Sequence, residues 1–121
     1  MEADPVRSPI RVALEVCPVE VGIAVLGGTW KLTVVKHLLE GGTMRSGDLS
    51  RTVPQASQRT LTRQLRELEQ DGVVHRRVYP EVPPRVEYSL TELGAGLADV
   101  VAAMNAWGRV YEAHLDGQNT A

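Results

Sequence analysis

Residues 57–72 read SQRTLTRQLRELEQDG, and the spacing of apolar and basic side chains within them decides the fold. Leucines recur at i, i+4 and i+7, which predicts a helix that buries one face; they are Leu61, Leu65 and Leu68. Basic and amide side chains repeat this spacing on the opposite face, at Arg59, Arg63, Arg66 and Gln70. A helix that is apolar on one side and basic on the other is typical of a DNA recognition helix.

The ends of this helix are also marked in the sequence. Pro54 stands upstream, and the hydroxyl of Ser57 can accept a hydrogen bond from the free amides of the first turn. Gly72 is placed to end the helix in a left-handed conformation, which glycine adopts without strain. A shorter helix is predicted before it, beginning after Ser46 as N-cap and ending near Val53. The two helices and their turn make a helix-turn-helix.

Two strand-like runs follow the recognition helix, at residues 73–79 and 85–90, and the second alternates apolar and polar side chains. Residues 80–84 join them and contain three prolines, which limit the conformations of the loop. A hairpin in this place predicts a wing beside the helix-turn-helix.

The wing carries three cations, Arg76, Arg77 and Arg85. Arg85 follows the prolines directly, and we expect it to contact a DNA groove or a phosphate. The alternative is an exposed ion pair of Arg85 with Glu81 or Glu87, which would contribute little to stability.

The last helix is predicted from the N-cap Thr91 to His114, with a tail that is disordered from Asp116. Large side chains recur along it in alternating steps of four and three, the spacing of a heptad seam: Leu93, Leu97, Val100, Met104, Trp107, Tyr111 and His114. A helix of about 35 Å is longer than so small a domain can cover. We therefore expect the seam to pair with a second copy, the alternative being that it encloses a small molecule between subunits.

The N-terminal part reads as an arm, residues 1–16, followed by two helices. Residues 1–9 are expected to be frayed, and residues 10–16 alternate in a way that favours a short strand, with a helix as the alternative. Pro18 fits the first turn of a helix that ends at Gly27. The next helix is predicted from Trp30 to Glu40 and packs Trp30 in the core, while Lys31 and Lys36 are expected in solvent.

Cys17 is the only cysteine of the chain and precedes Pro18 at the start of a helix. A thiol there is close to unpaired amides that stabilise its thiolate, which makes a redox sensor one interpretation. The other is a small apolar residue at a dimer contact, since the chain holds no second cysteine to resolve an oxidised one.

Composition limits the classes of function. With 121 residues, 43% hydrophobic and 23% charged, the chain is one globular domain without an apolar run of membrane-spanning length or a secretory signal pattern, so a cytoplasmic location is the default. The net charge is −2, yet residues 21–90 hold ten Lys and Arg against seven Asp and Glu. Neither a nucleophile with a base nor ligand spacing for a metal is present, so no enzyme, metal or cofactor is expected.

Several ordered motifs together resemble the HxlR-type winged helix-turn-helix transcriptional regulators, relatives of the MarR-like regulators. The resemblance covers residues 17–111 and rests on CPVE at 17–20, GGTWK at 27–31, SQRTLT at 57–62, QLREL at 64–68, DGVV at 71–74 and YPEVPPRVEYSLTELG at 79–94. The chain departs from the pattern at residues 44–47, where such proteins often carry an aromatic residue before the serine.

The resemblance implies a mainly α fold with a small β-hairpin, in which residues 17–115 form a winged helix-turn-helix domain with flanking dimerisation helices and residues 116–121 a tail. It implies a homodimer on double-stranded DNA, a pseudo-palindromic operator and repression by occlusion, with Cys17 sensing oxidants or electrophiles. Residues expected at the DNA are Ser57, Gln58, Arg59, Thr60, Thr62, Arg63, Arg66, Arg77 and Arg85. The alternatives are a winged-helix module that binds protein, and a regulator whose small-molecule inducer binds at the dimer interface.

Overall fold

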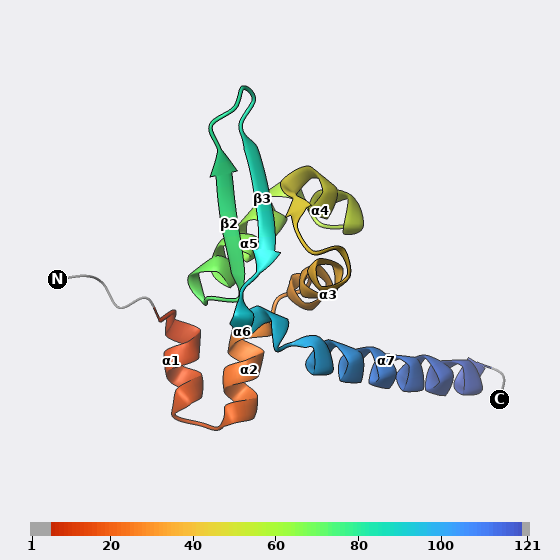
Figure 1. Ribbon diagram of the computed structural model, residues 1–121. Coiled ribbons are helices and arrows are strands. Elements are labelled where there is room, and N and C mark those ends of the chain that lie inside the picture. The colour runs from red at the N-terminus through yellow and green to blue at the C-terminus, as the bar shows by residue number, and fades with distance from the viewer. Residues whose placement is uncertain (1–5, 120–121) are drawn as a thin grey trace.

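The computed structural model describes residues 6–119, which form seven helices and three short strands (Figure 1). In chain order these are α1 (Ser8–Leu14), α2 (Pro18–Leu26), α3 (Lys31–Gly41), β1 (Met44–Arg45), α4 (Ser46–Thr52), α5 (Gln58–Gln70), β2 (Val74–Tyr79), β3 (Arg85–Leu90), α6 (Glu92–Ala95) and α7 (Ala98–Asn119). The chain is mainly helical with a small antiparallel sheet, and α4, α5 and the β2–β3 hairpin make a winged helix-turn-helix, as predicted.

The core is built around α5, whose leucine spacing is confirmed. Leu61, Leu65 and Leu68 are each at most 2% exposed, and they pack with residues of α3, α4 and the sheet. Both helix ends are also as predicted: the Ser57 hydroxyl oxygen accepts from the Thr60 amide at 3.1 Å, and Gly72 has a φ of +81°. Sequence spacing and capping chemistry therefore place this helix correctly.

The sheet has the strand order β1-β3-β2 and is antiparallel throughout. In the hairpin Val74 pairs with Leu90 and Tyr79 with Arg85, and the tip projects beyond the rest of the molecule (Figure 1). The strand β1 was not predicted, because two residues are too few to show a pattern. It pairs Met44 with Tyr88, and Met44 packs on the core in place of an aromatic side chain.

The expected strand at residues 10–16 is wrong, because the chain forms the helix α1 and packs against α2 as a helical hairpin (Figure 1). The alternation that favoured a strand puts Val12, Leu14 and Val16 in solvent, at 63–67% exposed, while Ala13 is buried. The arm is not frayed from Arg7 onward either, since Arg7 is held by Asp71. Residues 1–5 lie outside the described residues.

The start of α4 also differs in detail from the prediction. Ser46 is the first residue of the helix, and the N-cap position belongs to Arg45, which makes no side-chain cap. The β1–β3 pairing ends at Arg45 and fixes where the helix begins.

The single C-terminal helix predicted from Thr91 is broken into α6 and α7. Thr91 does cap α6, because its hydroxyl oxygen accepts from the Gly94 amide at 3.1 Å. The helix then stops at Gly96 and restarts after Leu97, whose carbonyl accepts from the Val101 amide. Two glycines in three residues weaken a helix, and Gly94 lies directly against the backbone of Val73.

The end of the chain is more ordered than predicted. Helix α7 continues to Asn119, past Asp116 where disorder was expected, and residues 120–121 are outside the described part of the chain. Over the described residues no single helix has the length and hydropathy of a membrane span. Helices α2 and α3 have them only when taken together, and the angle between the two helices is 79°.

The close approach at Gly94 gives a test of the fold. A methyl group at Gly94 would overlap the Val73 carbonyl, so Gly94→Ala should lower the free energy of unfolding by about 1 to 3 kcal/mol. Gly47→Ala in α4 is the matched control, because a Cβ there meets no atom within 4 Å, and it should be neutral or stabilising by up to about 1 kcal/mol. Urea denaturation measures both, and equal effects would contradict the role of Gly94.

Candidate nucleic-acid interface

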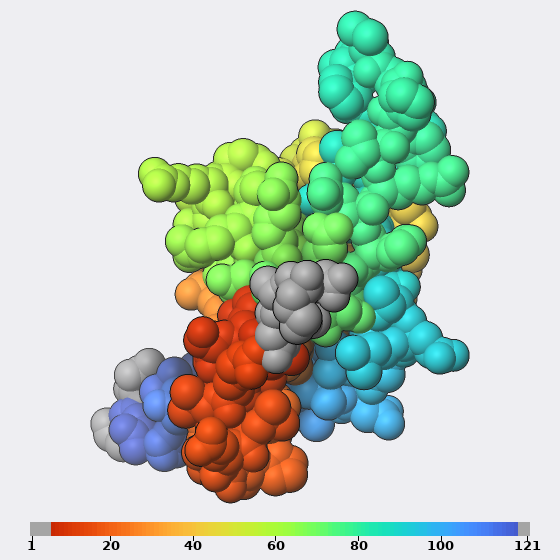
Figure 2. Space-filling model, turned by 90° about the vertical axis from the view of Figure 1, so that its left-hand side faces the viewer, coloured from red at the N-terminus to blue at the C-terminus, as the bar shows by residue number. Residues whose placement is uncertain are grey.

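The outer face of α5 presents a row of arginines to solvent. Arg59, Arg63 and Arg66 are all exposed, and none of them makes a hydrogen bond or an ion pair with the described residues 6–119. Figure 2 shows α5 in yellow-green beside the hairpin, with side chains projecting from the helix into solvent. These guanidinium groups keep their full set of donors for an external anion or base.

The first turn of α5 adds hydroxyl and amide groups to the same face. The Ser57 hydroxyl donates to Thr60 Oγ1 at 3.0 Å, and the Gln58 amide nitrogen donates to Thr62 Oγ1 at 3.4 Å. Gln58 also accepts from the hydroxyl of Ser50 in α4 at 3.2 Å. Seven of the residues expected at the DNA are thus together on one helix and its N-cap: Ser57, Gln58, Arg59, Thr60, Thr62, Arg63 and Arg66.

Two arginines of the wing pack on an aromatic ring, whereas the arginines of α5 project into solvent. The guanidinium carbons of Arg77 and Arg85 lie 4.7 and 3.9 Å from the centre of the Tyr79 ring, an arrangement that fixes both side chains by cation–π attraction. Arg77 is exposed and makes no ion pair within the described part of the chain. It is therefore the wing cation with its charge uncompensated.

Arg85 forms the ion pairs that were the alternative to a DNA contact. It lies 3.3 Å from Glu81 and 3.6 Å from Glu87, and its side chain is only 28% exposed. Two carboxylates compensate its charge, so a DNA contact by Arg85 would require it to leave them. The contact stays a prediction, and the pairing makes Arg77 the better placed of the two.

Behind α5, a buried cation fixes the helix to the rest of the domain. Lys31 was expected in solvent, but it is 2% exposed and its Nζ is 2.8 Å from Glu67. The hydrogen bond from Lys31 is the main cause that lowers the pKa of Glu67. The expectation was wrong because Lys31 lies on the same helical face as the buried Val34, Val35 and Leu38, at spacings of three, four and seven residues. That spacing was the signal for its burial.

A second clamp joins the N-terminal hairpin to the end of α5. Arg7 donates from Nη2 to Asp71 at 2.6 Å and to the Ala24 carbonyl at 3.0 Å, and from Nε to Asp71 at 3.0 Å. The Asp71 side chain is 2% exposed, and its hydrogen bond is the main cause that raises the pKa of Arg7. No local sequence pattern signals this pair, because 64 residues separate its members.

Gln64 is a further buried polar group of α5. It is 5% exposed, and its side-chain oxygen accepts from the Trp30 amide at 3.2 Å. Trp30 itself packs against the core, as predicted. The inner face of α5 is thus held by Lys31, Arg7 and Trp30, while its outer face remains open.

Away from α5, the described chain exposes a large apolar surface on α7. Five predicted seam residues are 41–66% exposed, namely Leu93, Val100, Met104, Trp107 and Tyr111, whereas Leu97 packs on the core. The break at Gly96 puts Leu93 on α6, so the seam on α7 itself begins at Val100. An apolar groove of about 460 Å³ lies between α2 and α7, with Ile23, Leu26, Val100 and Met104 among its walls.

Cys17 occupies the N-cap position of α2, with Pro18 in the first turn as predicted. The thiol is exposed and unbonded to another cysteine. Among residues 6–119, no three His, Cys, Asp or Glu side chains lie together as metal ligands would.

Residues 25–116 match the protein family described as HxlR-like helix-turn-helix. Among curated relatives, the uncharacterised HTH-type transcriptional regulator YdeP of Bacillus subtilis strain 168 is 48% identical over 102 residues, which cover 84% of this chain and 79% of YdeP. The match therefore includes the helix-turn-helix, the wing and most of α7.

Solved structures give the same picture. The redox regulator HypR in its reduced form has a TM-score of 0.77 at 46% identity, covering 84% of this chain and 99% of HypR, and its oxidised form has 0.71 at 50%, covering 78% and 96%. A transcriptional regulator of the MarR family from Porphyromonas gingivalis W83 has 0.72 at 34%, covering 78% and 92%. These relatives are transcriptional regulators, a class that is not enzymatic.

Substitutions that shorten Lys31 or remove its charge test the role of this buried lysine behind α5. Lys31→Ala should lower the free energy of unfolding by about 2 to 4 kcal/mol, because it leaves a cavity and removes the partner of Glu67. Lys31→Met keeps the buried volume and should lose less than about 2 kcal/mol, since Glu67 is partly exposed and still faces Arg7. Lys36→Met in the same helix is the control and should change little. Urea denaturation separates the three; an effect of Lys31→Ala as small as that of Lys36→Met would contradict the clamp.

Proposed function

The chain belongs to the HxlR-like helix-turn-helix family and is a helix-turn-helix transcriptional regulator, and from that premise we propose that it binds a pseudo-palindromic operator as a homodimer and represses by occluding the promoter. The observation that carries the proposal is the row of exposed arginines without protein partners on α5. In a protein of net charge −2, cations kept free on one helix face favour a polyanion as the partner.

The side chains of α5 divide by the contacts they suit. Arg59 and Arg63 can each donate two hydrogen bonds to a guanine edge in the major groove, and Gln58 can pair with adenine. The hydroxyl groups of Ser57, Thr60 and Thr62 and the guanidinium of Arg66 suit phosphates, and the methyl groups of the two threonines can contact thymine methyls. On the wing we assign the phosphate or groove contact first to Arg77, with Arg85 joining it if DNA displaces Glu81 and Glu87.

The homodimer is supported by the apolar side chains on α7. Val100, Met104, Trp107 and Tyr111 are about half exposed, and surfaces of this kind are typical of interfaces. The groove between α2 and α7 continues this surface and offers a place for the α7 helix of a second copy. A dimer with two-fold symmetry would place its recognition helices in major grooves about one helical turn, roughly 34 Å, apart.

We further propose that Cys17 makes the regulator responsive to oxidants or electrophiles. Its thiol is exposed at a helix N-terminus, and HypR, with 46–50% identity, is a redox regulator solved in a reduced and an oxidised form. With one cysteine in each chain, a protein disulfide has to join two subunits: two thiols lose two electrons and two protons to the oxidant.

The proposed DNA binding also implies a cytoplasmic location.

A winged-helix module that binds protein is the second candidate. Uncharged outer positions on α5 would favour it, and the arginines there disfavour it. Control by a small inducer at the dimer interface is a variant of the main proposal rather than a rival, since it leaves the DNA contacts unchanged.

The proposal predicts that Arg63 reads sequence. On an operator found among DNA fragments upstream of the protein's own and neighbouring genes, Arg63→Ala should weaken binding by about 1 to 3 kcal/mol and much less on random DNA, because a base contact is lost. Arg11→Ala in α1 removes the same charge elsewhere and should change neither. Fluorescence anisotropy at two salt concentrations measures this. Equal losses on operator and random DNA would reduce Arg63 to a phosphate contact, and no selective binding by the unaltered protein would favour the protein-interaction candidate.

The second prediction concerns Cys17. Treatment with diamide should change operator affinity in the unaltered protein and be reversed by a thiol reductant, while Cys17→Ser should bind DNA normally and ignore diamide. Electrophoresis without reductant shows whether a cross-linked dimer forms. If diamide leaves DNA binding unchanged, Cys17 is a packing residue and the redox proposal fails, whatever becomes of the DNA proposal.

A further inference from the structure

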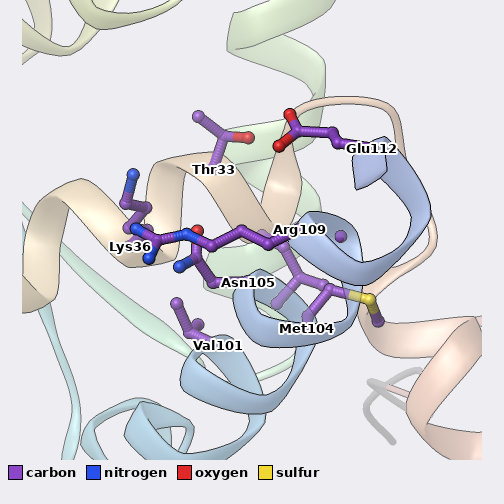
Figure 3. Close-up of a pocket in the computed structure, with 9 residues that line it drawn as sticks. Thr33, Lys36, Val101, Met104, Asn105, Arg109 and Glu112 are labelled. Carbon is purple, nitrogen blue, oxygen red and sulfur yellow. The ribbon is translucent and has the colours of Figure 1, made fainter. Parts of the chain in front are cut away.

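A cavity of about 360 Å³ lies between α3 and α7, and neither α5 nor the wing contributes to its walls. Figure 3 shows side chains from the two helices facing each other across it. Its volume is within the range of small-molecule sites in proteins, which is about 300 to 1,000 Å³. No contact proposed for DNA uses it.

Two cations meet at one end of this cavity. Arg109 extends from α7 toward Lys36 of α3, with the Asn105 side chain beside them (Figure 3). Neither cation is in an ion pair with any described residue, and the nearby Glu40 is 3.9 Å from His37 instead. Two like charges facing one space repel each other, and an anion placed between them would remove that repulsion.

The rest of the lining limits what the anion can be. Leu32, Val101 and Met104 give the cavity an apolar wall, which favours an organic body over an inorganic ion. At the opposite end the Glu112 carboxylate points toward the Thr33 hydroxyl (Figure 3). Glu112 would repel a second negative charge there and would accept a hydrogen bond from a hydroxyl group.

Gly108 keeps the cavity open. It lies in the middle of α7, where glycine is about 1 kcal/mol less favourable than alanine, and a Cβ there would meet no atom of the described chain within 4 Å. A larger side chain at this position would therefore fill the cavity without a clash. Of the seven residues predicted for the heptad seam, only Met104 lines the cavity, so pairing through the others leaves most of its walls uncovered.

We propose that this cavity binds a small organic monocarboxylate with an apolar body and a hydroxyl group at its far end. Arg109 and Lys36 take the carboxylate, Asn105 adds a hydrogen bond, and Glu112 accepts from the hydroxyl. The site spans the helix that packs against α5 and the helix proposed to dimerise. Any effect of the ligand on operator binding rests on the proposed function, whereas binding to the cavity does not.

Isothermal titration calorimetry of the full chain without DNA tests the site. The probe is para-hydroxyphenylacetate, compared with its uncharged amide and with tyramine, which keep the ring and hydroxyl but change the other end. The carboxylate should bind about tenfold more tightly than the amide, as expected for charge-assisted hydrogen bonds, and tyramine should not bind. Equal affinities for acid and amide, or no binding of the acid, would overturn the proposal.

Variants connect the binding to the cavity. Arg109→Gln and Lys36→Met should each weaken binding of the acid about tenfold, Gly108→Leu should abolish it, and Glu112→Gln should weaken it because the ligand hydroxyl loses a charged acceptor. Arg11→Gln is the control for loss of a cation elsewhere, and thermal unfolding confirms that each variant is folded. Unchanged binding in both Arg109→Gln and Gly108→Leu would overturn the site. Operator titrations of the same samples are scored separately, so loss of the DNA proposal and loss of the site are distinguishable.

Discussion

The position of the recognition helix α5 depends on the ion pairs behind it. A recognition helix has to present one face to DNA and so cannot be enclosed, which leaves its inner face to fix its position. Here Lys31 binds Glu67 from α3, and Arg7 binds Asp71 from the N-terminal hairpin. Charge pairs are directional in a way that leucine contacts are not, so they fix the rotation of α5 about its own axis as well as its depth in the core.

These ion pairs also determine which charges of α5 are compensated within the domain and which are not. The acids of α5 and its end, Glu67, Glu69 and Asp71, are each bound by a cation from another element: Lys31, Arg76 and Arg7. The arginines of α5 are left without intramolecular partners and face outward. A chain that is acidic overall thereby carries a basic helix face, and the net charge of such a protein says little about the surface that would meet DNA.

Much of this architecture follows from short-range sequence signals, because regular apolar spacing and a capping residue at each end are enough to predict the bounds and the buried face of a helix. Leu61, Leu65 and Leu68, with Ser57 and Gly72, were enough for α5, and the alternation in residues 85–90 was enough for β3. The failures involve long-range partners. The spacing of Lys31 within α3 signalled its burial, but its charge partner Glu67 lies on another helix, and α1 packs against α2, a contact that no local pattern shows. The break at Gly96 comes two residues after Gly94, which lies directly against the backbone of Val73. At the interface, the sequence pattern placed the α5 side chains on one face but left two outcomes open for Arg85, and the structure shows the ion pairs with Glu81 and Glu87.

The break between α6 and α7 has a mechanical consequence. Helix α7 has 22 residues and is about 33 Å long, and it leaves the domain at one short joint near Leu97 (Figure 1). A rotation of about 5° at that joint moves the far end of the lever by about 3 Å, roughly the rise of one base pair along DNA. In an assembly joined through α7, the distance between the α5 helices of two copies therefore depends on a few degrees of backbone rotation beside Gly96.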